Sequence, residues 1–142
     1  MDVTATLDAS CSPERLFAEV IDLSTYPTWL TIVTRADRRE DGADAWTVDL
    51  RGRLGPLARS KRLRMERTEL DSPRRVRFER REAGGRNSSP WVLEATVEPT
   101  AGGSRLTMSL HYGGSFGAGL LERMLTDEIE RSRPALLARL AT

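Results

Sequence analysis

Three polar side chains have the same parity as apolar residues of predicted strands, and they are candidates for chemistry. Arg80 and Glu82 continue the alternation of Val76 and Phe78, and Tyr112 ends a later alternating run. Arginine can bind a carboxylate bidentately, glutamate can transfer a proton, and the tyrosine hydroxyl can donate a hydrogen bond. The alternative is that Arg80 and Glu82 lie at a solvent-exposed strand end or pair with each other, and that the Tyr112 hydroxyl is wet.

The other reactive residues give no recognisable catalytic or metal-binding pattern. His111, the single histidine, alternates with Leu110 and Tyr112 and is therefore expected to face solvent. Cys11 precedes a helix start, where the helix dipole can lower a thiol pKa, but a buried small residue is the alternative. One cysteine and one histidine do not make a zinc site without several carboxylates. We expect no metal and no cofactor.

The composition is typical of one globular domain over residues 1–142. Apolar residues make up 39% and charged residues 30%, and the net charge is +1. So small a charge gives no field that would attract nucleic acid, and we expect no such partner. No apolar run reaches the length of a bilayer span, which predicts no stable membrane insertion. The first residues lack a leader pattern, and with a single cysteine we expect a cytoplasmic protein. The oligomeric state stays open.

Alternation of apolar and polar residues predicts seven strands. They cover about residues 3–9, 32–38, 46–51, 59–70, 75–80, 91–98 and 106–112. Turns rich in Gly, Pro, Asn or Asp are expected at 41–42, 52–56, 71–73, 83–90 and 101–103. The glycine-rich segment 113–119 precedes a helix and is interpreted as a turn, with an anion site as the alternative.

Two helical regions flank the later strands. Ser12 and Pro13 predict a helix start, and Pro27 ends that helical region. From about Leu120, apolar residues recur at helical spacing to the end of the chain. Pro134 lies inside this pattern and is expected to kink the helix, or to split it with Ser132 as the cap of a second half.

This order of elements predicts an α+β fold. Six consecutive strands joined by short turns form an antiparallel meander. Because apolar and polar residues alternate along each strand, one face of the sheet is exposed to solvent and the apolar face has to be buried against another element. The C-terminal helix is the largest element available to cover it.

A local motif adds a family resemblance to this architecture. Residues 22–29 read Asp-Leu-Ser-Thr-Tyr-Pro-Thr-Trp, and they follow a first strand and a Ser-Pro-Glu helix start. The chain thereby resembles the START-like (SRPBCC) superfamily, by motif over residues 3–30 and by element order throughout. The resemblance implies a helix-grip fold, in which a curved seven-stranded antiparallel sheet wraps around the long C-terminal helix. Two short helices follow the first strand, and a hydrophobic cavity lies between the sheet and the C-terminal helix. Trp29 is interpreted as a hydrophobic plug, with a lid edge over the cavity as the alternative.

Strand parity and the helical stripe name the residues that would line such a cavity. The expected ligand-binding residues are Trp46, Met65, Phe78, Arg80, Glu82, Trp91, Leu93, Met108, Leu110, Tyr112, Leu121, Met124 and Leu125. Periodicity alone is equally compatible with a fully packed core, so the cavity itself is implied only by the resemblance.

The resemblance also implies a set of possible functions. Members of the superfamily bind lipids, polyketides, quinones or hormones, and some catalyse cyclisation or dehydration. We expect a carrier or binding protein for a small hydrophobic ligand. The first alternative is a polyketide cyclase or dehydratase that uses Arg80, Glu82 and Tyr112. The second is a protein-interaction module of the quinone-chaperone or ribosome-associated kind.

Overall fold

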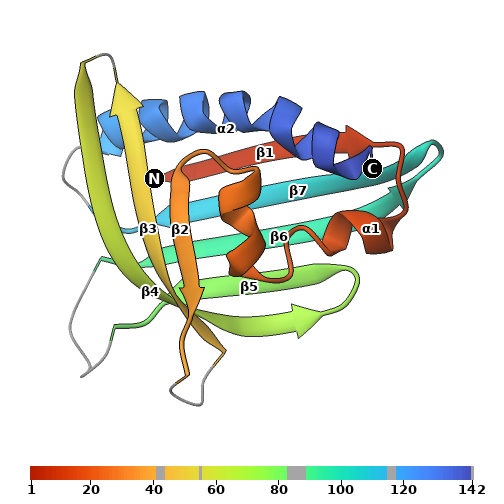
Figure 1. Cartoon of the computed structure of the whole chain (residues 1–142), viewed down its shortest axis with the longest axis horizontal. Coiled ribbons are helices and arrows are strands. Elements are labelled where there is room, and N and C mark those ends of the chain that lie inside the picture. Colours follow the sequence, from red (N-terminus) through yellow and green to blue (C-terminus); the bar gives the residue numbers. More distant parts are fainter. Residues whose placement is uncertain (41–43, 55, 83–88, 115–117, 142) are drawn as a thin grey trace.

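A seven-stranded antiparallel sheet and a long helix dominate the structure, a computed structural model that describes residues 1–40, 44–54, 56–82, 89–114 and 118–141 (Figure 1). The elements in chain order are β1 (Asp2–Ala9), α1 (Pro13–Phe17), the 3₁₀ helix η1 (Leu23–Thr28), β2 (Val33–Arg38), β3 (Ala45–Leu54), β4 (Leu57–Asp71), β5 (Arg75–Arg80), β6 (Trp91–Thr100), β7 (Gly103–Tyr112) and α2 (Ala118–Leu140). The predicted α+β helix-grip fold is confirmed. The expected turn at 41–42, most of the loop at 83–90 and the centre of segment 113–119 lie outside the described residues.

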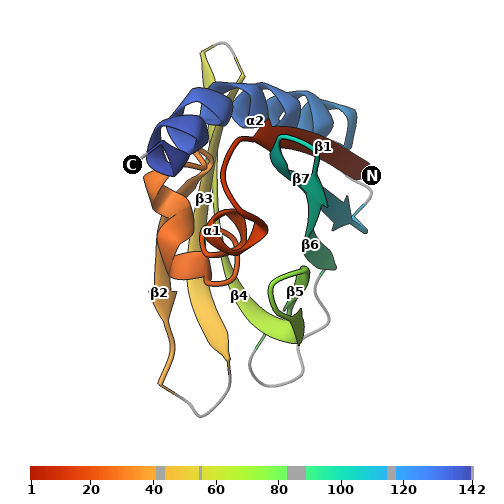
Figure 2. The same cartoon turned by 90° about the vertical axis from the view of Figure 1, so that its right-hand side faces the viewer.

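The sheet is a meander that the first strand completes. Its strand order is β1-β7-β6-β5-β4-β3-β2, and every neighbouring pair is antiparallel. β1 joins β7 over its whole length, from Asp2 opposite His111 to Ala9 opposite Ser104. Figure 2 shows the sheet curling, with α2 lying between its two ends, and α2 packs against both β1 and β3. The inner face of the sheet and α2 therefore enclose the core.

The short helices begin where the sequence places caps. The Ser12 hydroxyl accepts a hydrogen bond from the Arg15 amide at 3.2 Å, and Pro13 is the first residue of α1. Asp22 caps η1 by accepting from the Ser24 amide at 2.8 Å. Both caps satisfy amides that a helix start leaves without partners.

Pro134 does not split the C-terminal helix, contrary to one of the two outcomes expected for it. α2 runs without interruption from Ala118 to Leu140. The Ser132 hydroxyl caps no second helix, because it donates to the Glu128 carbonyl oxygen at 2.7 Å and accepts from the Thr31 amide at 2.9 Å. Packing along the whole helix offsets the hydrogen bond that proline removes.

Gly52 lies within β3, so the turn predicted at 52–56 is shorter than expected. It pairs with Arg59 of β4, and it is buried under α2. A Cβ atom built on Gly52 would lie 2.1 Å from the sulfur of Met124. The glycine thus marks a close approach of helix to strand rather than a turn.

We expect Gly52→Ala to lower the free energy of unfolding by about 1–2 kcal/mol, because the added methyl group displaces Met124 from its place on β3. Chemical denaturation measures the loss. Gly102→Ala is the matched control, since a Cβ there meets nothing within 4 Å. A double change, Gly52→Ala with Met124→Ala, is expected to lose less than the two single losses added together. Strict additivity would contradict the proposed contact.

Candidate functional site

Two apolar cavities lie between α2 and the inner face of the sheet. The larger has a volume of about 90 Å³ and is lined by residues that include Val3, Ala5, Leu7, Met108, Ile129 and Leu136. The smaller, about 70 Å³, lies beside β3 and β4 and is lined by residues that include Tyr26, Val33, Val48, Leu63, Met65 and Trp91. Each is smaller than the roughly 150 Å³ of an engineered protein cavity that holds one benzene. A ligand of that size or larger therefore needs side chains to move.

A single wall separates the two cavities. The residues that line both of them are Leu30, Ile32, Leu93, Leu110 and Leu125. They come from the segment before β2, from the neighbouring strands β6 and β7, and from α2. All five are aliphatic, so the wall has no hydrogen bonds between side chains that would hold it in place. These five side chains form the boundary that the two cavities share.

The predicted site residues divide into two groups. Those that line a cavity are Met65, Trp91, Leu93, Met108, Leu110 and Leu125. Those that line neither are Trp46, Phe78, Arg80, Glu82, Tyr112, Leu121 and Met124. Trp46 and Phe78 instead pack edge to face, with ring centroids 5.6 Å apart, and fill the core beside the smaller cavity.

Arg80 and Glu82 form an ion pair. Arg80 Nε donates to Glu82 Oε1 at 2.8 Å, and Arg80 Nη1 donates to the Ser89 carbonyl oxygen at 3.2 Å. Glu82 Oε1 also accepts from the Arg64 amide at 3.3 Å. Of the interpretations that the sequence allowed for Arg80 and Glu82, mutual pairing is the one seen.

Tyr112 and His111 occupy opposite faces of β7. The Tyr112 ring packs against Trp91, with centroids 4.9 Å apart, and its hydroxyl lies against Gly114. His111 is exposed, as its parity predicted, and its Nδ1 lies 2.8 Å from Asp2 Oδ1. Cys11 is partly buried beside Ser104, with Sγ and Oγ 4.0 Å apart.

The sequence did not predict that β1 and the segment before β2 contribute residues to the wall of the larger cavity. Val3, Ala5 and Leu7 line the larger cavity because β1 pairs with β7 opposite Leu110, Met108 and Leu106. The alternation of β1 was visible, but its place beside β7 was not. Trp29 also lines this cavity and is buried, so the residue that was interpreted as a plug forms part of the wall.

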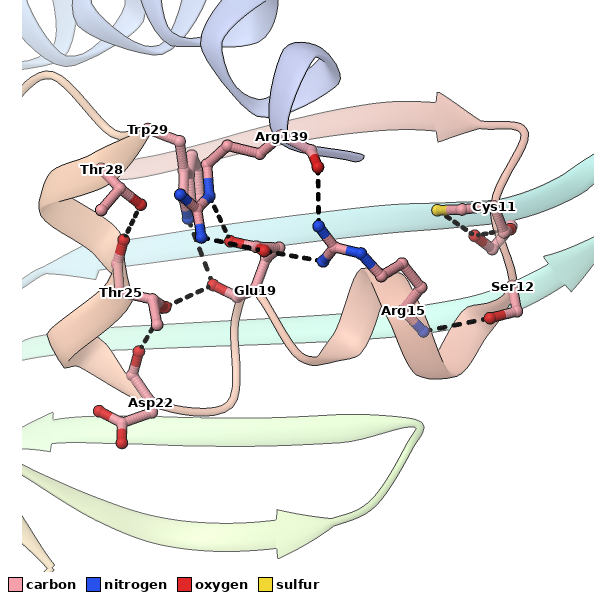
Figure 3. Close-up of polar contacts among 10 residues, drawn as sticks. Cys11, Ser12, Arg15, Glu19, Asp22, Thr25, Thr28, Trp29 and Arg139 are labelled. Carbon is pink, nitrogen blue, oxygen red and sulfur yellow. Dashed lines mark hydrogen bonds and ion pairs between the residues drawn. The ribbon is translucent and has the colours of Figure 1, made fainter. Parts of the chain in front are cut away.

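Glu19 connects the end of α2 to the helical region after β1 (Figure 3). Its carboxylate accepts from Arg15 Nη1 at 2.7 Å and from Arg139 Nε at 2.8 Å. Its carbonyl oxygen accepts from Trp29 Nε1 at 3.2 Å and from the Thr25 hydroxyl at 3.1 Å. Burial alone would raise the pKa of Glu19, but the hydrogen bonds from Arg139 and Arg15 outweigh it and lower that pKa. Glu19 is therefore charged at neutral pH and holds α2 beside the cavity wall.

A second connection ties the middle of α2 to the segment before β2. The Thr31 hydroxyl donates to the buried Glu128 carboxylate, and Arg131 Nη2 donates to Glu128 Oε1 at 3.0 Å. The Thr31 amide reaches Ser132, which lines the larger cavity. The two connections therefore hold the middle and the C-terminal end of α2.

The comparisons with known proteins agree with this architecture. A model of the family described as polyketide cyclase / dehydrase and lipid transport proteins matches residues 1–141. The chain belongs to this family. No curated protein matches the sequence.

Solved structures share the fold of this family member at low sequence identity. A START superfamily protein from Mycobacterium smegmatis is 16% identical, with a TM-score of 0.72 over 99% of this chain and 97% of its own. A protein from Chromobacterium violaceum is 14% identical, with a TM-score of 0.72 over 99% and 98%. An AHSA1 protein from Silicibacter pomeroyi is 19% identical, with a TM-score of 0.68 over 99% and 98%. At these identities the likeness shows the shared fold.

Among the described residues no group of three or more His, Cys, Asp or Glu side chains could hold a metal ion. Burial raises the pKa of Tyr26, and its hydroxyl donates to the Val20 carbonyl oxygen at 2.9 Å. Tyr26 therefore stays neutral beside the smaller cavity. Within the described residues, no helix is long and apolar enough to cross a membrane.

Proposed function

We propose that this protein binds a small hydrophobic molecule in the space between α2 and the sheet, as a carrier or binding protein. The observation that supports the proposal is the pair of apolar cavities separated by one aliphatic wall. Filling such a void with an apolar ligand is favourable, because the atoms that line the void then make dispersion contacts that they lack when it is empty.

The lining is adaptable enough for a ligand larger than either cavity. Met108 lines the larger cavity and Met65 the smaller one. Methionine has an unbranched, flexible side chain that fits irregular shapes at low cost. Movement of the wall between the cavities would give a ligand access to both.

The described geometry favours binding over catalysis. A cyclase or dehydratase needs a polarising or proton-transferring group that reaches the substrate. The charged pair Arg80 and Glu82 is engaged with itself and lies off both cavity walls. No observation specifically favours the enzyme or the protein-interaction module, so both remain predictions from the sequence.

The methionines allow a direct test of binding. In protein labelled with ¹³C at the methionine methyl groups, toluene is expected to shift the Met65 and Met108 signals saturably. Met124 lines neither cavity and serves as an internal reference. Toluene is larger than benzene, which occupies an engineered cavity of roughly 150 Å³, so it binds in either cavity only if the wall between them moves.

Two variants of β1 distinguish toluene binding in the cavity from toluene binding at the surface. Ala5→Leu places extra carbons in the larger cavity and is expected to weaken toluene binding by about tenfold, since the void is then filled. Thr4→Leu adds a leucine to the exposed face of the same strand and is expected to leave binding unchanged. Absence of any saturable shift at Met65 and Met108 would contradict the proposed function.

A further inference from the structure

The positive charges that lack an ion pair are gathered in one part of the molecule. Most described arginines bind an acidic side chain or a carbonyl oxygen, as Arg62 does with Asp49 at 2.7 Å. Among the described residues, the cations whose side chains form no hydrogen bond or ion pair are Arg51, Arg53, Arg59, Lys61 and Arg123. All five are exposed. The first four lie in the hairpin of β3 and β4, and the fifth lies on α2, which crosses that hairpin.

The end of this hairpin carries charge of one sign. Residues 50–54 and 56–62, here called the basic hairpin, contain four arginines and one lysine and no acidic residue. Because the net charge of the whole chain is +1, the rest of the chain carries a net charge of −4. An anionic surface therefore attracts the basic hairpin and repels the rest of the molecule, which orients the protein as it approaches.

The cations lie on both faces of the basic hairpin. Arg59 pairs with Gly52, on whose inner side Met124 of α2 packs, so Arg59 is on the inner face. Arg51 and Arg53 alternate with Gly52 along β3 and are therefore on the outer face. Figures 1 and 2 show β3 and β4 extending past α2 at this end. The hairpin thus projects from the molecule with positive charge on two sides.

This arrangement distinguishes between the possible anionic partners. A nucleic acid or an acidic protein that docks beside the hairpin contacts the cations of one face. The headgroups of a bilayer surround a projecting end, so they reach the cations of both faces at once. The basic hairpin also has no aromatic residue on which bases could stack. Leu120, 40% exposed and one helical turn before Met124, adds apolar surface on the side of α2 that meets the hairpin.

We propose that the basic hairpin docks this protein on membranes that contain anionic lipids, as a peripheral contact at the level of the headgroups. Clusters of four or more lysines and arginines bind anionic leaflets, and each cation near the surface strengthens binding about fivefold. Leu50, at the base of the basic hairpin, lines the smaller cavity, so docking brings that cavity close to the membrane. Docking requires no ligand in the cavities, so failure of either proposal leaves the other intact.

Cosedimentation with lipid vesicles tests the docking. The protein is expected to bind vesicles of phosphatidylcholine with about 30% phosphatidylserine, and to bind vesicles of phosphatidylcholine alone at least about tenfold more weakly. Binding to the anionic vesicles is expected to be lost in about 0.5 M NaCl, because salt screens exposed charges. Equal binding to both kinds of vesicle overturns the proposal.

Charge-matched variants locate the contact. Arg51→Gln with Arg53→Gln is expected to weaken binding to the anionic vesicles about 25-fold, since two cations leave the outer face. The control, Arg74→Gln with Arg105→Gln, removes the same charge from two exposed arginines that pair with acidic side chains outside the hairpin. It is expected to change binding less than about twofold. Circular dichroism and thermal unfolding verify that both variants are folded.

A second pair of changes tests the contact on both faces. Arg59→Gln with Lys61→Gln removes two cations of the inner face and is expected to weaken binding about as much as the outer pair does. A loss in only one of these two variants overturns docking among the headgroups. An equal loss in the control variant overturns the role of the hairpin. Tighter binding to a DNA duplex or to polyglutamate than to the anionic vesicles overturns the membrane as the partner.

Discussion

Replacing Glu19 with glutamine is expected to lower the free energy of unfolding by about 2 kcal/mol, because the negative charge and one of the two oxygens that accept hydrogen bonds from Arg15 and Arg139 are lost. The Glu19 side chain is 5% exposed and binds both Arg15 and Arg139. The loss stays below the larger cost of breaking a fully buried pair, since both arginines are partly exposed and keep some hydration. Urea denaturation of the two proteins at neutral pH measures the difference.

The pH dependence distinguishes the charge of Glu19 from a loss of packing. The folded protein lowers the pKa of Glu19 from its ordinary value of 4.5, so the charged form contributes stability above that pH. This contribution is lost as the pH falls through the lower pKa of the folded state. The difference between Glu19→Gln and the unchanged protein should therefore be constant from pH 5 to 8 and shrink below about 4.5.

Glu130→Gln is the matched control for the same chemistry at the surface. Glu130 pairs with Arg133 on α2, but its side chain is 61% exposed. Exposed ion pairs contribute little, so the expected loss is below about 0.5 kcal/mol. An equal loss for both variants would show that burial of Glu19 is not what makes its contacts stabilising.

Leu125→Ala is expected to combine the largest change in ligand binding with a loss of about 3 kcal/mol in the free energy of unfolding. Leu125 lines both cavities, so its truncation opens the wall between them. The joined cavity accepts toluene without the cost of moving the wall, and toluene is expected to bind at least about tenfold more tightly. Thermal unfolding with and without toluene, together with the methionine methyl shifts, measures both effects.

Leu136→Ala provides the comparison on the same helix. Leu125 and Leu136 are both 3% exposed, but Leu136 lines only the larger cavity. We expect a similar loss of stability and a smaller gain in toluene binding. If both variants bind toluene equally well, the Leu125 side chain in the wall between the two cavities is not what limits toluene binding.

The strands were predictable because alternation is a local property. Trp46 and Val48 alternate with polar neighbours, and both are buried against the core. The start of α1 was equally local, since Ser12 and Pro13 act on the amides next to them. Gly52 was misplaced because the same residue suits a turn and a close helix contact, and the helix in question is about 70 residues away in the chain.

For the candidate site, the sequence predicted which face of the sheet each side chain lies on, but not whether that side chain lines a cavity. Parity correctly placed Leu93 and Leu110 on the inner side, but it also selected Trp46 and Phe78, which fill the core instead of lining a void. Whether an inward side chain contacts another side chain or an empty space depends on how α2 and η1 pack against the curved sheet. Their positions depend on contacts such as the one between Glu19 and Arg139, which the periodicity of the sequence does not reveal.

The polar residues Arg80, Glu82 and Tyr112 show the same division between what the sequence determines and what the tertiary structure decides. Alternation by itself determined that Arg80 and Tyr112 belong to strand faces and that His111 points away from Tyr112, whereas Glu82 lies beyond the end of β5. The tertiary structure decided what these side chains contact, because packing of distant segments sets the distances between them. It joined Arg80 to Glu82, placed Tyr112 against Trp91, and left the Trp91 indole N–H as a buried donor without a partner among the described residues. Chain spacing fixes the direction of a side chain, but only the packed sheet and helix determine which groups it meets.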